Sequence, residues 1–113
     1  MEKEYVKPIV VSKIFEEHRK EIYLYTIDKF GYYQAEVYDK KIENSLRTLA
    51  MHNMLYPECR FLASKNKRYR NIILDAHLIV YRITAEKIEI LDIIHSASSI
   101  RKIKGTRIIR IET

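Results

Sequence analysis

The spacing of apolar residues changes at about Pro57, and this change limits the fold more than any other feature of the chain. Before Pro57 the apolar residues recur at near-helical intervals, whereas after it they form short runs of Ile, Leu, Val and Tyr. Proline cannot continue a helix, so the two patterns are separated in the chain. The sequence therefore predicts an α+β fold with its helices first.

The first half predicts a strand followed by two helices. Residues 6–11 are rich in β-branched side chains, and Pro8 favours an edge strand because proline cannot donate to a sheet. Ser12 is a suitable N-cap for a helix that runs to about Phe30, and Gly31 interrupts the pattern. A second helix is predicted by a further apolar stripe, which consists of Ala35, Tyr38, Ile42, Leu46 and Leu49.

The second half predicts an antiparallel meander of strands over residues 69–74, 77–83 and 87–94. The connections between these runs are too short for crossover helices. We expect the helical hairpin to cover one face of a curled sheet in a two-layer domain that spans residues 1–113. Residues 56–67 are expected to form an exposed basic loop, and residues 96–113 a basic C-terminal tail or an extra strand.

The chain is basic, with a net charge of +6 and a pI near 9.4, which predicts attraction to nucleic acid, an acidic protein segment or an anionic surface. No apolar stretch approaches the roughly 20 residues that a membrane span requires, so we expect a cytoplasmic protein without membrane contact. The single Cys59 is expected to be inert. We expect no metal and no cofactor, because the histidines lack ligand partners at metal-binding spacing.

Several segments resemble the RelE/ParE toxin superfamily, whose members are also described as plasmid stabilisation proteins. In chain order these segments are "IVVS", "YPECR", "KRYRNI", "HLIVYRI" and "KIEILDIIHS". The resemblance implies a growth-inhibiting toxin of a type II toxin–antitoxin system, neutralised by an acidic antitoxin. ParE-like members of the superfamily inhibit DNA gyrase, whereas RelE-like members cleave mRNA on the ribosome.

The RelE-like activity would make the chain a metal-independent ribonuclease. RNA cleavage through the 2′-hydroxyl needs a proton acceptor, a proton donor and nearby cations. His95 is the best titratable candidate, and the supporting candidates are Arg70, Lys67 and Arg101. However, Leu78 and Ala97 stand where the RelE pattern has arginines.

We favour the ParE-like reading, because many ParE-like members carry a histidine directly after the fourth strand, as His95 does here. In this reading the chain is not an enzyme and its arginines bind a partner. The partner-binding candidates are Arg68, Arg82, Arg107 and Arg110. A third hypothesis is a degenerate member that only binds its antitoxin. The target, gyrase or ribosome, stays open at this point.

Overall fold

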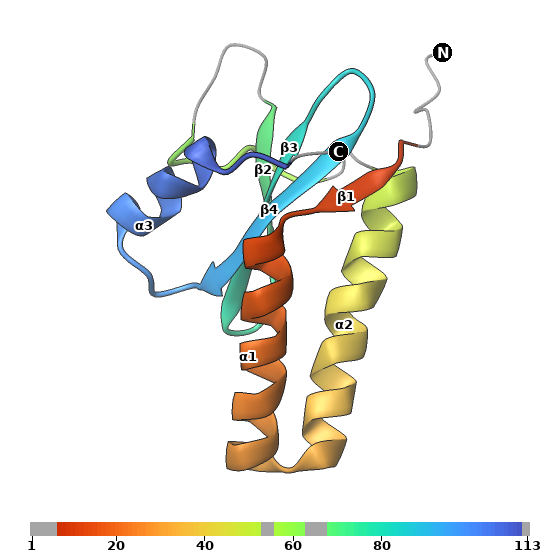
Figure 1. Ribbon diagram of the computed structural model, residues 1–113, viewed down its shortest axis with the longest axis vertical. Coiled ribbons are helices and arrows are strands. Elements are labelled where there is room, and N and C mark those ends of the chain that lie inside the picture. Colours follow the sequence, from red (N-terminus) through yellow and green to blue (C-terminus); the bar gives the residue numbers. More distant parts are fainter. Residues whose placement is uncertain (1–6, 53–55, 63–67, 112–113) are drawn as a thin grey trace.

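The computed structural model describes residues 7–52, 56–62 and 68–111. Its first large feature is a helical hairpin of α1 (Lys13–Phe30) and α2 (Tyr32–Met51) (Figure 1). Ser12 caps α1 as predicted: its Oγ accepts a hydrogen bond from the backbone N–H of Phe15 at 2.9 Å. The Ser12 hydroxyl also donates to the carbonyl of Leu91 at 2.6 Å, which ties the start of α1 to the sheet.

Gly31 joins the two helices with a backbone conformation that side chains disfavour. Its φ of 91° and ψ of 167° lie in a region that glycine occupies almost alone. The chain can therefore reverse within one residue. The predicted boundary between the helices is confirmed.

The sheet contains β1 (Ile9–Val11), β2 (Tyr69–Ile73), β3 (His77–Ile83) and β4 (Ile88–His95) in the order β1-β4-β3-β2. β2, β3 and β4 form the predicted antiparallel meander. β1 is an edge strand, as Pro8 directly before it indicated, and it pairs in parallel with β4. The first of the four described strands thus lies beside the last.

The helical hairpin covers one face of this sheet, as expected for an α+β fold of this kind (Figure 1). The core on that face joins residues of both helices to residues of the three meander strands. Its fully buried members include Phe15, Ile42, Leu49, Tyr81 and Ile90.

The other face of the sheet is also covered, in part, by segments that the sequence analysis did not place there. α3 (Ile100–Gly105) contributes Ile103, and the segment after Pro57 contributes Cys59 and Leu62, each at most 4% exposed. They pack against Tyr69 and other residues of the meander. Seven of the eight residues of β4 are consequently buried.

Two predictions about these segments need correction. The segment from residue 56 to 62 is not simply an exposed loop, because the apolar side chains of Cys59 and Leu62 fill the second face of the sheet. The tail forms α3 and the short 3₁₀ turn η1 (Thr106–Ile108), and no strand forms among residues 96–111. Ser99 accepts from the N–H of Lys102 and starts α3 in place of a strand.

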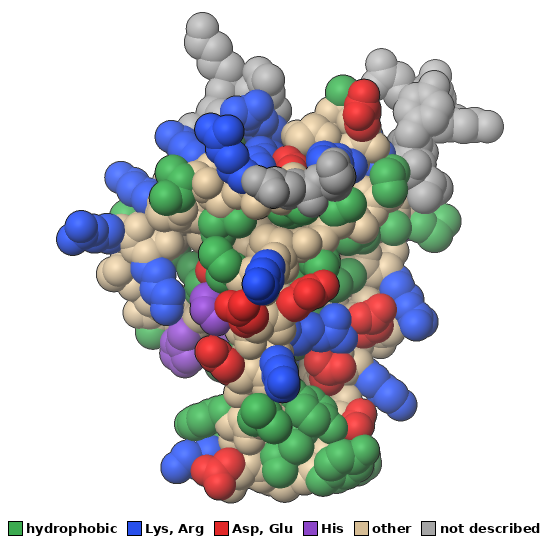
Figure 2. Space-filling view, in the orientation of Figure 1, with side chains coloured by type: hydrophobic (Ala, Val, Ile, Leu, Met, Phe, Trp, Pro, Cys, Tyr) green, Lys and Arg blue, Asp and Glu red, His purple; other side chains and the backbone are tan. Residues whose placement is uncertain are grey.

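The far end of the helical hairpin extends beyond the sheet and exposes a group of large apolar side chains (Figures 1 and 2). We call this group the hairpin tip; it consists of Leu24, Tyr25, Phe30, Tyr32 and Tyr33, which are 54–75% exposed. Tyr25, Tyr32 and Tyr33 therefore lie on the surface of the helical hairpin and not in its core. None of the described helices has the length and apolarity needed to cross a membrane.

Candidate functional site

Histidines from three elements meet where β3 and β4 approach the helical hairpin. The rings of His77 and His95 lie 5.6 Å apart between centroids, at the paired ends of β3 and β4. Nδ1 of His77 is 2.7 Å from the hydroxyl oxygen of Tyr38 on α2. His18 on α1 is hydrogen-bonded to Asp92 of β4, with 2.6 Å between Nδ1 and Oδ1.

These histidines line a small cavity, which we call the histidine pocket. Its volume is about 150 Å³, and its charged or titratable lining residues are His18, Glu21, His77, His95 and Lys102. The isoleucines at positions 22, 93 and 94 supply an apolar part of the wall. Within the described ranges, no group of three or more His, Cys, Asp or Glu residues is arranged to hold a metal ion.

The two neighbouring rings of the pocket differ in their surroundings. Burial lowers the pKa of His77, and the nearby His95 lowers it further. His95 is exposed, and its Nδ1 accepts a hydrogen bond from the backbone N–H of Ala97 at 3.1 Å. Burial raises the pKa of Tyr38, and a hydrogen bond from the backbone of Ala76 offsets part of that rise.

Of the four candidates for a ribonuclease site, the three that the structure describes are not brought together. Arg70 is aligned with Tyr81 in the sheet, at the end far from His95, and its Nη1 donates to the carbonyl of Tyr56 at 2.7 Å. Arg101 is exposed on α3 and does not line the histidine pocket. Lys67 lies outside the described residues.

The residues that do accompany His95 are His77 and Lys102, neither of which we selected from the sequence. His77 begins a strand and Lys102 lies in a short helix that follows no clear apolar pattern. The signal that could have found His77 is its place opposite His95 in an antiparallel pair, which requires the register of the meander to be known.

Three of the four predicted partner-binding arginines gather around one aromatic ring. The guanidinium carbons of Arg68, Arg82 and Arg107 lie 5.4, 5.7 and 5.4 Å from the centroid of the Tyr69 ring. Burial alone would raise the pKa of Tyr69, but a hydrogen bond from Arg82 and the charges of all three arginines outweigh it and lower that pKa. Arg110 is exposed, and no interaction places it in this cluster.

Arg82 is held inside the fold rather than presented to a partner. Its Nε donates to Oε1 of Glu89 at 2.7 Å, and the two side chains are 13% and 8% exposed. Nη2 also donates to the carbonyl of Ile109 at 3.2 Å. Arg82 therefore connects β3 to β4 and to the segment after α3.

A second hollow, of about 470 Å³, lies beside α3 and carries cations without an acidic residue in its lining. Arg60, Lys104 and Arg107 supply the charge, and Phe61, Leu62 and Ile100 supply apolar surface. Burial raises the pKa of the nearby Cys59 thiol, which agrees with an inert packing role. We call this hollow the basic hollow.

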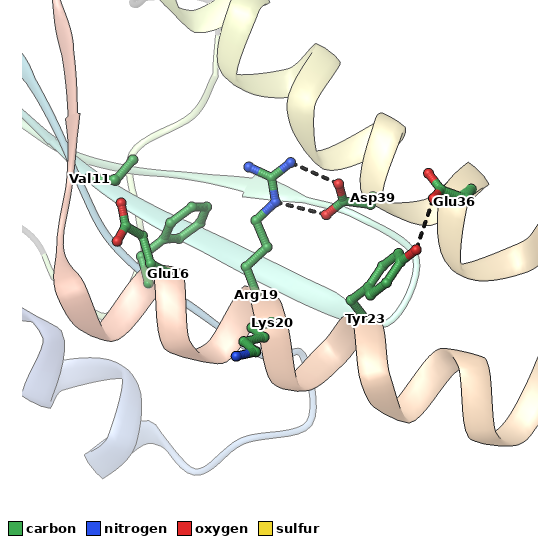
Figure 3. A pocket seen from close by; sticks show the side chains of 8 residues that line it. Val11, Glu16, Arg19, Lys20, Tyr23, Glu36 and Asp39 are labelled. Carbon is green, nitrogen blue, oxygen red and sulfur yellow. Dashed lines mark hydrogen bonds and ion pairs between the residues drawn. The ribbon is translucent and has the colours of Figure 1, made fainter. Parts of the chain in front are cut away.

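A third hollow, of about 450 Å³, opens between α1 and α2 (Figure 3). Arg19 spans it and donates to both carboxylate oxygens of Asp39, at 2.8 and 3.1 Å, and to Glu43 at 3.0 Å. Further out, the hydroxyl of Tyr23 donates to Glu36 at 2.9 Å. These polar contacts join the helices where the apolar core ends.

The sequence matches a known toxin family over most of its length. The family described as "ParE toxin of type II toxin-antitoxin system, parDE" covers residues 9–100. The chain belongs to the ParE toxin family. The match runs from β1 to the start of α3, so every strand and both long helices lie within the ParE toxin region.

The ParE-like fold is also found in a solved structure from a chromosomal ParDE toxin–antitoxin system of P. aeruginosa. The two chains are 16% identical, with a TM-score of 0.65, and the likeness covers 81% of this chain and 98% of that one. At this identity the likeness shows a shared fold. No curated protein matches the sequence.

Proposed function

We propose that this chain arrests growth by inhibiting DNA gyrase and that an acidic cognate antitoxin neutralises it. The observation that carries the proposal is its membership of the ParE toxin family, which rests on the match over residues 9–100. The proposed action needs protein contacts and no chemical step by the chain itself.

The geometry of the histidine pocket favours this action over RNA cleavage. A general base needs a ring nitrogen that is free to take a proton. Because Nδ1 of His95 accepts from a backbone amide, the proton of its neutral ring is carried by Nε2, which leaves no acceptor on that ring. Arg70 is aligned with Tyr81, four residues along β3 from the His77–His95 pair, or roughly 13 Å.

Two exposed surfaces suit contact with another protein. The hairpin tip offers aromatic side chains such as Phe30 and Tyr33, at 69% and 75% exposure. The basic hollow combines cations with apolar surface, and interfaces are enriched in aromatic residues and arginine. The basic hollow also fits an acidic antitoxin segment that carries an apolar anchor.

The test is a supercoiling assay with purified gyrase and relaxed plasmid DNA. We expect the protein to block supercoiling, and we expect the antitoxin encoded beside it to restore the reaction when mixed in first. Full supercoiling at every protein concentration would contradict gyrase inhibition. In that case, primer extension on mRNA from induced cells would reveal ribonuclease activity. Normal growth on induction would instead support the third hypothesis, a chain that only binds its antitoxin.

The proposed antitoxin complex should show the salt dependence of opposite charges. The net charge of +6 predicts that added salt slows association more than it speeds dissociation, because long-range attraction acts before contact. Surface plasmon resonance at increasing salt measures both rates. An association rate unaffected by salt would contradict an acidic partner.

A further inference from the structure

The histidine pocket is a cluster of titratable side chains that the proposed function does not use. The chain has four histidines, and three of them line this pocket. They come from α1, β3 and β4, and Lys102 reaches the pocket from α3. The fold thus gathers residues from distant parts of the sequence at one small cavity.

The hydrogen bonds at Nδ1 determine what His95 can offer to a ligand. Its Nδ1 accepts from the N–H of Ala97, and a backbone amide can only donate. The proton of the neutral ring must therefore sit on Nε2. His95 thus has an N–H donor at Nε2 to offer to a ligand.

His77 also has a hydrogen-bond partner at Nδ1, because this nitrogen lies 2.7 Å from the hydroxyl oxygen of Tyr38. Nε2 is therefore the ring nitrogen of His77 that a ligand would meet, and in the protonated ring it carries an N–H donor. The ammonium group of Lys102 adds further donors and a positive charge.

Other groups around the pocket limit the ligand to a small one with a single negative charge. The volume is about 150 Å³, and Glu21 contributes one negative charge to the wall. His18 is already engaged by Asp92. A doubly charged phosphate would meet stronger repulsion from these two acids than a carboxylate. The apolar wall of Ile22, Ile93 and Ile94 suits the methylene groups of an acidic side chain.

We propose that the histidine pocket binds the carboxylate of an aspartate or glutamate from an acidic protein partner, held by the N–H groups of His77 and His95 and by Lys102. The identification of that partner as the antitoxin rests on the proposed function. The pocket would then orient the partner, while the basic hollow supplies a broader attraction.

A bound carboxylate has a consequence for pH dependence. Its charge favours the protonated form of both rings, so the complex takes up protons and its affinity rises as the pH falls through the histidine range. The groups that face the rings are His18 and Glu21 of α1, Tyr38 of α2, Asp92 of β4 and Lys102 of α3.

The first test uses acetate as the carboxylate probe on the full chain. Imidazole NMR signals are followed as acetate replaces chloride at constant ionic strength. We expect the signals of His77 and His95 to shift and their pKa values to rise, whereas His52, at the end of α2, serves as the internal control. Equal shifts of all histidines, or none, would overturn the proposal. Inorganic phosphate is titrated in parallel. A stronger response to the phosphate dianion than to acetate would also overturn the proposal.

Variants give the second test, with the antitoxin as ligand. His95→Ala should weaken binding by about tenfold, as expected for loss of a charge-assisted hydrogen bond. His95→Gln keeps an N–H donor and should restore most of the affinity but not the rise at low pH. His52→Ala is the matched control and should behave as the unaltered chain.

The outcomes separate this inference from the proposed function. If the antitoxin binds all variants equally with the same pH dependence, the pocket is not its carboxylate site, although toxin neutralisation stands. If no antitoxin binds but acetate still shifts His77 and His95, the pocket stands and its assignment to the antitoxin falls.

Discussion

The guanidinium of Arg82 and the carboxylate of Glu89 form an ion pair that is almost fully removed from solvent. Removing one partner of such a pair leaves the other charge buried without compensation. Lys87 lies 3.9 Å from Glu89 and would compensate in part. Arg82 also donates to the carbonyl of Ile109, so its loss would release the segment after α3 from the sheet.

Arg82→Ala should therefore destabilise the fold by about 3 kcal/mol, at the lower end of the range for a broken buried pair. Urea unfolding followed by circular dichroism measures this change. Arg82→Met combined with Glu89→Leu should recover most of the loss, since no charge is then left buried. If Arg82→Ala alone is as stable as the original chain, the ion pair of Arg82 and Glu89 is not buried in solution.

His77 gives the stability of the fold a pH dependence of predictable sign. Its pKa in the folded chain lies below the ordinary histidine value, because burial and His95 disfavour its charged form. The unfolded chain therefore binds the proton first as the pH falls below about 6.5, and stability decreases from there through the folded pKa. Above that range the contribution of His77 is fully present.

The prediction is that His77→Gln flattens this loss of stability between neutral and mildly acidic pH. Urea unfolding at several pH values measures the slope, and His52→Ala is the control that should retain it. An unchanged slope in His77→Gln would assign the pH dependence to another group.

At the scale of elements, α1 depends on Ser12 more than α3 depends on Ser99, although both serines cap a helix. Ser12 is 3% exposed, accepts from Phe15 and donates to the carbonyl of Leu91. Ser99 is exposed and accepts from Lys102 at 3.2 Å. The two serines form a matched pair for one substitution.

Ser12→Ala should cost about 2 kcal/mol, because a cap is lost and a buried carbonyl is left without its donor. Ser99→Ala should cost no more than about 1 kcal/mol, the usual value for an exposed cap. Thermal unfolding of the two variants and of the original chain measures both losses of stability. Equal effects would mean that the bond between Ser12 and the sheet contributes nothing.

The elements that the sequence predicted well are those whose signals are local. Ser12, Gly31 and the apolar stripes mark the helical hairpin, and the short runs after Arg68 mark the meander. The parallel pairing of β1 with β4 joins residues 79 positions apart, such as Ile9 and Ile88, and no local pattern indicates it. α3 escaped prediction because it has six residues and one buried side chain, Ile103.

At the scale of the whole molecule, the hairpin tip is apolar surface that the fold does not bury. Phe30→Ser combined with Tyr33→Ser should change the free energy of unfolding by less than about 1 kcal/mol, since exposed side chains contribute little. The same variant should bind less of a dye that reports exposed apolar surface. A large loss of stability would show that the tip packs against the rest of the chain in solution.

The candidate site was only partly accessible from the sequence, because it is assembled by the whole fold. His95 was selected from its place directly after the last predicted strand of the meander. His77 reaches it through the register of β3 and β4, and Lys102 through the position of α3, both of which depend on packing across the sheet. Arg70 was selected as a basic residue that could supply a cation beside His95. The register of β2 and β3 instead places it toward the other end of the sheet.

The pairing of β1 with β4 also determines when, during translation, the protein can complete its fold. Residues 9–51 leave the ribosome before β4, which begins at Ile88 and supplies Ile88, Ile90 and Ile93 to the core beneath the helices. Until β4 emerges, β1 has no partner strand and the core on that face of the sheet is incomplete. A nascent chain interrupted before Ile88 therefore lacks the folded toxin, and the cell acquires the folded form only after β4 has been synthesised.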